Sequence, residues 1–180
     1  GALDGPVGGE IPNGEKGVAT GRVTDSHGLP IAGATVVINN AVWFNKNIVL
    51  TSDANGFYRV AMSATDSWYV RGTTAVTYNG RTYTIDLHPD FAGSFAGVDG
   101  HVVNLSWRLT GEVPKEFGHD GYYGGSVEMD AGWDLSDLAG VTLTLTPAGT
   151  LLDGSAGQAI TRTITEPVGS LALRDVPMGR

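Results

Sequence analysis

The stretch GRVTDSHGLPIAGATVVI (residues 21–38), followed by TSDANGFYRV (residues 51–60), decides the fold predicted for this chain. Runs of β-branched and aromatic residues alternate there with Gly, Asp and Pro, the residues of tight turns. Gly33 precedes the run that ends at Ile38, and glycine lets the backbone turn sharply into a strand. Because side chains alternate along a strand, we expect Val36 and Ile38 to face the core together.

Further strand candidates follow at short intervals in residues 67–72, 81–87 and 101–109, and Asn79-Gly80 is typical of a hairpin turn. No segment of the first half spaces its apolar residues as a helix does over several turns. The chain is therefore predicted to be all-β, with a Greek-key β-sandwich favoured over an alternation of strands and helices.

The second half of the chain contains a loosely spaced copy of the same pattern. IAGATVVINN (residues 31–40) is matched by LAGVTLTLTP (residues 138–147), with Gly140 in the place of Gly33. The pattern indicates an internal repeat in which Leu143 and Leu145 point one way, as Val36 and Ile38 do.

Composition then suggests the domain boundaries. We expect a flexible leader in residues 1–16, a first β-sandwich in 17–110, a Gly-rich linker or long loop in 111–125 and a second module in 126–180. The second module has fewer strand candidates than the first. It is expected either to be part of a larger module or to have its open sheet edge covered by another chain.

Charge and composition exclude several classes of partner. The chain of 180 residues has a formal net charge of -8 and a pI of about 4.8, which disfavours nucleic acid and anionic membranes. No apolar run approaches the roughly 20 residues that span a bilayer, so no membrane insertion is expected. There is no cysteine, which excludes disulfides and Cys-based metal sites and fits bacterial rather than vertebrate export. The expected location is extracellular, cell-surface or periplasmic.

Residues 17–109 resemble the carboxypeptidase regulatory-like domain, a prealbumin-like β-sandwich of about seven strands whose fold is close to that of starch-binding domains. The likeness lies in the Gly-x-Val strand at Gly21, the Gly-x-Pro-Ile-x-Gly-Ala turn ending at Ala34 and the Gly-x-Tyr strand at Tyr58. It implies an immunoglobulin-like or prealbumin-like sandwich that is usually non-catalytic and flanks enzymes or surface proteins. LRDVPMGR (residues 173–180) is similar to an element of such modules, which suggests two tandem modules.

The residues that could carry catalysis lack the required spacing. His27, His88, His101 and His119 form no zinc-binding motif, and Ser126 lacks the strand-turn-helix context of a nucleophile elbow. A small hydrolase is therefore a third hypothesis that no motif supports.

A calcium site is the one cofactor that the sequence suggests. Asp130, Asp134 and Asp137 lie close together, and further oxygen-rich turns occur at Asp25, Asp53 and Asp153. The alternative is ordinary turn chemistry, in which each Asp hydrogen-bonds to its local backbone.

Adjacent aromatic residues are the candidates for ligand binding, because flat rings can stack on the apolar faces of sugars. The predicted platform consists of Trp43, Phe44, Trp68, Tyr69, Tyr122, Tyr123 and Trp133. In a strand, adjacent residues face opposite sides, so one ring of each pair is expected in the core, together with Tyr58 and Trp107.

Two functions remain open from the sequence. The first is a non-enzymatic structural or interaction module that contacts other domains of the same protein or of a neighbouring surface protein. The second is a carbohydrate-binding module that holds a polysaccharide on its exposed rings.

Overall fold

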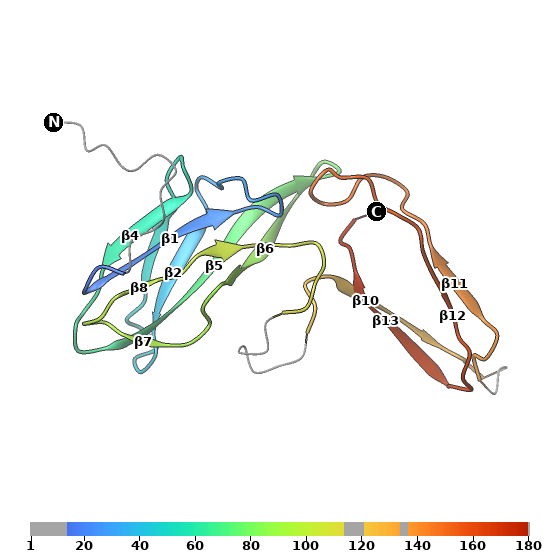
Figure 1. Ribbon diagram of the computed structural model, residues 1–180. Coiled ribbons are helices and arrows are strands. Elements are labelled where there is room, and N and C mark those ends of the chain that lie inside the picture. The colour runs from blue at the N-terminus through green and yellow to red at the C-terminus, as the bar shows by residue number, and fades with distance from the viewer. Residues whose placement is uncertain (1–13, 114–120, 134–136, 180) are drawn as a thin grey trace. The chain divides into compact units, whose positions relative to one another are not determined.

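In the computed structural model, residues 14–113, 121–133 and 137–179 are described (Figure 1). They fold into β-strands and connecting turns, which confirms the predicted all-β sandwich class. The chain divides into an N-terminal unit, Gly1–Trp107, and a C-terminal unit, Arg108–Arg180. No membrane-spanning helix occurs in the described part of the chain.

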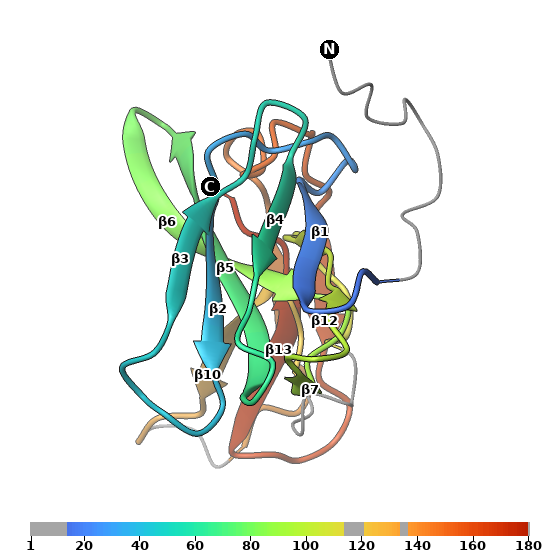
Figure 2. The same ribbon diagram turned by 90° about the vertical axis from the view of Figure 1, so that its left-hand side faces the viewer.

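The N-terminal unit is one hydrogen-bonded sheet that folds over itself, in the order β3-β2-β5-β6-β9-β1-β4. Strands β7 and β8 attach to β5 and β1. Figure 2 shows β1 beside β4 and β2 beside β5 and β3, as their pairing requires. Its strands are β1 (Val18–Thr24), β2 (Thr35–Asn40), β3 (Ile48–Thr51), β4 (Phe57–Ala61), β5 (Ser67–Tyr78), β6 (Arg81–Pro89), β7 (Phe95–Ala96), β8 (His101–Val102) and β9 (Leu105–Ser106).

The core of this unit follows the alternation predicted from the sequence. Val36 and Ile38 on β2 are fully buried, and Tyr58 and Trp107 are also in the core, as expected. Burying one such aliphatic side chain stabilises the fold by about 1.5–3 kcal/mol. The unit is therefore stabilised mainly by residues at every second position of its central strands.

The turn before β2 is built by Gly33 and Ser52. Gly33 has a φ of 73°, which confirms that its backbone needs the freedom of glycine. Its N–H donates to the Ser52 carbonyl at 2.9 Å, and the Ser52 hydroxyl donates to the Ile31 carbonyl at 2.6 Å. These bonds fix the register in which β2 pairs with β3.

The strands on the two edges of β1 are joined at the carbonyl of Val103, which lies between β8 and β9. Gly21 and Tyr58 lie opposite each other on β1 and β4, and the Tyr58 hydroxyl donates to the Val103 carbonyl at 2.6 Å. A Cβ on Gly21 would lie 1.8 Å from the same oxygen. The Gly-x-Val and Gly-x-Tyr motifs therefore supply the two residues that let the Val103 segment pack against β1.

The C-terminal unit consists of two separate antiparallel ladders. Strand β10 (Gly125–Asp130) pairs with β13 (Ser170–Val176), and β11 (Thr142–Leu145) pairs with β12 (Ile160–Thr163). Leu138 and Ile164 are its buried apolar residues among those described, while Leu143 and Leu145 are only partly buried. This unit therefore has a much smaller core than the N-terminal unit.

Several predicted boundaries fall on residues with local structure. Residues 1–13 of the predicted leader lie outside the described residues, whereas Glu15 forms an ion pair with Arg59 at 2.7 Å. Within the predicted linker 111–125, Tyr123 N–H donates to the Gly111 carbonyl, and Asp175 accepts hydrogen bonds from Gly111 and Gly124 N–H. Asp175 has a φ of 60°, so these bonds hold a backbone conformation that is unusual for a non-glycine residue.

Replacing Tyr58 by Phe is expected to lower the free energy of unfolding by about 1–3 kcal/mol, because the buried Val103 carbonyl loses its donor. Urea denaturation measures this change. Tyr83→Phe is the control, since Tyr83 is exposed on β6. An equal effect of both substitutions would show that the Tyr58 hydrogen bond has no special role.

Tyr58 also predicts a loss of stability at alkaline pH. Burial raises the pKa of its phenol above the usual value of about 10, and Asp90 adds to the shift. Above that pH the unfolded chain releases the proton while the folded chain retains it, so stability falls as the pH rises. We expect this loss in denaturation series at increasing pH and a smaller loss in Tyr58→Phe.

Candidate functional site

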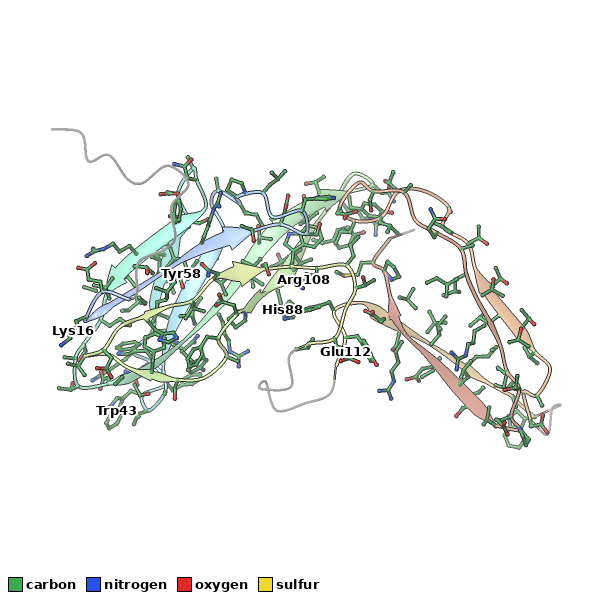
Figure 3. All side chains as sticks on the ribbon, in the orientation of Figure 1. Lys16, Trp43, Tyr58, His88, Arg108 and Glu112 are labelled. Carbon is green, nitrogen blue, oxygen red and sulfur yellow. The ribbon has the colours of Figure 1, made fainter. Side chains whose placement is uncertain are left out.

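The loop between β2 and β3, residues 41–47, exposes three consecutive apolar side chains. Val42 is 68% exposed, Trp43 54% and Phe44 96%. Figure 3 shows Trp43 at the periphery of the N-terminal unit, whereas Tyr58 lies between its strands. We call residues 42–44 the apolar tip.

The amide side chains of Asn40, which is buried, and Asn47, which is exposed, hold the backbone of this loop in place. The Asn40 Oδ1 accepts hydrogen bonds from the N–H groups of Val42 at 2.9 Å and Trp43 at 2.8 Å. Asn47 Oδ1 accepts from Asn40 N–H at 3.1 Å, and Ala41 N–H donates to the Ser67 carbonyl at 2.7 Å. These hydrogen bonds fix the backbone at the base of the loop. The side chains of residues 42–44 are exposed to solvent above it.

Asn40 itself is buried, and its Nδ2 has no hydrogen-bond partner. An unsatisfied buried donor is unfavourable by about 1–3 kcal/mol, so this loop conformation lowers the free energy of unfolding by an amount of that order. The two bonds that Oδ1 accepts fix the orientation of this amide.

Two cation–π pairs lie at or near the apolar tip. The Lys46 Nζ lies 5.5 Å from the centroid of the Trp43 ring, and the Arg71 guanidinium lies 5.4 Å from that of Tyr69. Tyr69 is the partner of Asn39 across β2 and β5, at the end of β2 from which the loop begins. Rings, cations and an amide therefore occur together at this end of the sheet.

The structure corrects the predicted platform at Trp68. This residue is only 3% exposed, because it lies on the core-facing side of β5, and its Nε1 donates to the Ser63 carbonyl at 3.2 Å. Tyr69 faces the opposite side, as alternation requires. The same rule was wrong for Trp43 and Phe44, which are both exposed because they lie in a loop rather than a strand.

The other predicted ring positions lie in the C-terminal unit. Trp133 is fully exposed, and Tyr122 is exposed beside a partly buried Tyr123, whose ring lies 5.9 Å from the Arg108 guanidinium. They belong to a different unit from the apolar tip.

The acidic turns follow ordinary turn chemistry. Asp25 Oδ1 accepts hydrogen bonds from His27 and Leu29 N–H, and Asp53 Oδ1 accepts from Asn55 and Phe57 N–H. Asp153 likewise accepts from Ser155 N–H at 2.9 Å. These carboxylates are therefore engaged with the backbone at their own turns.

Two of the three calcium candidates, Asp130 and Asp137, lie in the described residues. Asp137 accepts a hydrogen bond from Ala139 N–H, Asp130 is exposed at the end of β10, and Asp134 lies outside the described residues. In the described part of the chain, no three His, Cys, Asp or Glu side chains are grouped to hold a metal ion.

The histidines are placed by the fold in different settings. His27 lies in the turn after Asp25, as expected, whereas His88 lies within β6 rather than in a loop. Burial lowers the pKa of the His88 imidazole, and Asp86 on the same strand opposes this shift. His101 packs against Phe91 and Phe95 at centroid distances of 4.3 and 5.2 Å, and His119 lies outside the described residues.

Sequence reasoning missed the roles of Asn40 and Arg71. An Asn immediately before an apolar loop is a signal for a side chain that caps local N–H groups. The Arg71–Tyr69 pair follows from their i, i+2 spacing, which places both side chains on one face of a strand.

Comparisons with known proteins add only distant likenesses. No family model matches the chain, and no curated protein matches it. A candidate carbohydrate-binding protein from Pseudomonas aeruginosa matches 53% of this chain and 90% of its own, with 16% identity and a TM-score of 0.33. Mercury-inhibited catechol 1,2-dioxygenase from Acinetobacter sp. ADP1 matches 54% of each chain, with 18% identity and a TM-score of 0.30. At these scores neither match assigns a ligand or a reaction to this chain.

Replacing Asn40 by Ala is expected to loosen the loop, because two loop N–H groups lose their acceptor, while removal of the unsatisfied Nδ2 offsets part of the loss of stability. Hydrogen exchange at the Val42 and Trp43 amides should become faster. Asn39→Ala is the control, since Asn39 makes only a 3.3 Å bond to the Val37 carbonyl. Unchanged exchange at Val42 and Trp43 in Asn40→Ala would contradict the proposed role of Asn40.

Proposed function

We propose that this chain is a non-catalytic interaction module of an exported or cell-surface bacterial protein, and that the apolar tip contacts another protein domain. The observation that carries this proposal is the exposure of Val42, Trp43 and Phe44 on a loop whose backbone is hydrogen-bonded at its base. Adjacent exposed apolar side chains mark interaction sites more often than isolated ones do.

The fold supports a scaffold role for the rest of the N-terminal unit. The loop begins and ends on β2 and β3, and β2 is paired on its other edge with the long strand β5. A partner that binds the apolar tip would meet side chains on a loop with little freedom to reorganise, which reduces the entropy lost on binding.

We further propose that the chain is related to carboxypeptidase regulatory-like modules and contains two of them. Support comes from Gly21 and Tyr58, two motif residues that meet at the Val103 carbonyl. It also comes from Gly140, whose φ of 83° resembles the 73° of Gly33. Such modules are usually non-catalytic, which agrees with the absence of a catalytic motif in the sequence.

Carbohydrate binding is the second candidate function. The observation that favours it is the occurrence of Trp43 and Tyr69 with Lys46, Arg71 and Asn39 at one end of the sheet. Rings can stack on sugar C–H faces, while cationic and amide groups donate hydrogen bonds to hydroxyls. This site would depend on Tyr69 and Arg71 as well as on the loop.

Site-specific photo-crosslinking tests the first function. Phe44→p-benzoylphenylalanine in the full chain, mixed with a bacterial cell-envelope extract, is expected to crosslink to a defined protein. Phe57→p-benzoylphenylalanine is the control, because Phe57 is also exposed but lies on β4. Crosslinks that are the same at both positions, or absent at position 44, would contradict the proposal.

A polysaccharide pull-down, with calcium and with chelator, separates the two functions. The interaction module predicts no retention on any polysaccharide. Retention that falls at least about tenfold in both Trp43→Ala and Tyr69→Ala, the loss of more than about 1.4 kcal/mol of binding, would replace it by the carbohydrate function.

A further inference from the structure

The hairpin formed by β5 and β6 ends in a two-residue turn, Asn79-Gly80. Tyr78 and Arg81, which flank this turn, are the last paired residues of the two strands. Asn79 has a φ of 49° and Gly80 has a φ of 72°. Two successive left-handed residues are typical of a type I′ turn, for which Asn-Gly is a preferred sequence. The hairpin turn predicted from the sequence is therefore confirmed.

This turn lies at the end of a two-stranded arm. Strand β2 pairs with β5 only as far as Thr73, and the described residues of β5 beyond that position pair with β6 alone. Figure 2 shows the β5–β6 hairpin reaching past β3, which pairs with the other edge of β2. Two strands alone have little stability of their own, so the end of the arm opens at a small cost in free energy.

The space around the turn is open. Asn79 and Gly80 are both exposed. A Cβ built on Gly80 would have no described atom within 4 Å, apart from its own chain neighbours. Because glycine has no side chain, the Gly80 nitrogen is also accessible to groups of the preceding residue.

Asn55-Gly56 is the same dipeptide in a closed setting, the turn before β4. Gly56 N–H donates to the Asp53 carbonyl at 3.0 Å, and the Gly56 carbonyl accepts a hydrogen bond from Val23 N–H at 2.8 Å. A Cβ on Gly56 would lie 2.6 Å from the Val23 carbonyl and 3.1 Å from Pro30. This glycine is therefore held by its hydrogen bonds and enclosed by its neighbours.

The backbone of Asn55 is held at both of its polar groups. Its N–H donates to Asp53 Oδ1 at 2.8 Å, and its carbonyl accepts a hydrogen bond from Arg22 Nε at 3.4 Å. Any rotation that brings the Gly56 nitrogen to the Asn55 side chain must break several of these bonds. The two Asn-Gly turns thus differ in how freely their backbones can rotate.

We propose that Asn79 is a site of spontaneous deamidation in the folded chain, and that the turn around Asn55 protects this residue from the same reaction. The Gly80 nitrogen attacks Asn79 Cγ, and the new C–N bond closes a cyclic imide. The amide nitrogen of Asn79 leaves as ammonia, together with the proton of the Gly80 N–H. Water then cleaves one of the two imide C–N bonds, which yields either Asp or isoaspartate at position 79.

Both products change the end of the arm. Each adds a negative charge at position 79, and isoaspartate also places an extra methylene in the main chain. A longer main chain no longer fits the type I′ turn, so the pair formed by Tyr78 and Arg81 is expected to open. Deamidation would therefore alter the β5–β6 arm progressively as the protein ages.

Incubation of the full chain in mildly alkaline buffer, followed by brief trypsin digestion and mass spectrometry, tests the proposal. Trypsin places the two asparagines in separate peptides, residues 47–59 and 72–81. In the folded chain we expect Asn79 to convert at least about tenfold faster than Asn55. In the two isolated peptides the rates should be similar, because both contain Asn-Gly without the fold.

Two substitutions act on the two turns separately. Asp53→Ala removes the acceptor of the Asn55 and Phe57 N–H groups, so Asn55 should convert faster while the rate at Asn79 is unchanged. Gly80→Ala adds a methyl group beside the attacking nitrogen, so conversion of Asn79 should fall at least about tenfold while the rate at Asn55 is unchanged. Circular dichroism checks that both variants fold.

Equal conversion of Asn79 and Asn55 in the folded chain would overturn the proposal. So would a rate at Asn79 in the folded chain that is at least about tenfold below that of its isolated peptide. An unchanged rate at Asn55 in Asp53→Ala would show that its turn does not protect it. Asn79 follows the opposite end of β5 from Tyr69, so the crosslinking at Phe44 is independent of these results.

Discussion

The carbonyl of Val103 is the point on which the N-terminal unit depends. This oxygen lies over Gly21, where any side chain would collide with it. It also accepts a hydrogen bond from the hydroxyl of Tyr58 on β4. The Val103 N–H in turn donates to the Thr20 carbonyl at 2.8 Å. These bonds draw β8 and β9 against β1, and β9 also pairs with β6. One residue without a side chain and one phenol thus hold the β8–β9 segment against β1, and β9 continues the sheet to β6.

The strand pairing of this unit explains how an apolar loop can remain exposed. The pairing of β2 with β3 and β5 buries Asn40, and Asn40 then fixes the backbone of Val42 and Trp43. In the C-terminal unit the residues that correspond to Gly21 and Tyr58 are Met129 and Leu171, an apolar pair. In the described residues this pair belongs to a two-stranded ladder, which agrees with the small buried core there.

Much of the fold could be predicted from local pattern. The burial of Val36 and Ile38, the left-handed Gly33 and Gly140 and the turn role of Asp53 each follow from one residue and its near neighbours. The exposure of Phe44 could not be predicted in this way, because alternation applies only within strands. The partial burial of Leu143 could not be predicted from the sequence either, because its local pattern matches that of Val36. Val36 lies on a strand that pairs with β5, whereas in the described residues β11 pairs with β12 alone.

The central claim is that β2 is paired along both of its edges, whereas β11 is paired along one edge only in the described residues. Native-state hydrogen exchange of the full chain, followed residue by residue, tests it most directly. We predict slow exchange on β1, β2 and β5 and much faster exchange at Thr142 and Thr144, whose N–H groups face the free edge. Equal protection of β2 and β11 would contradict the claim, because it would mean that the edge of β11 is already covered.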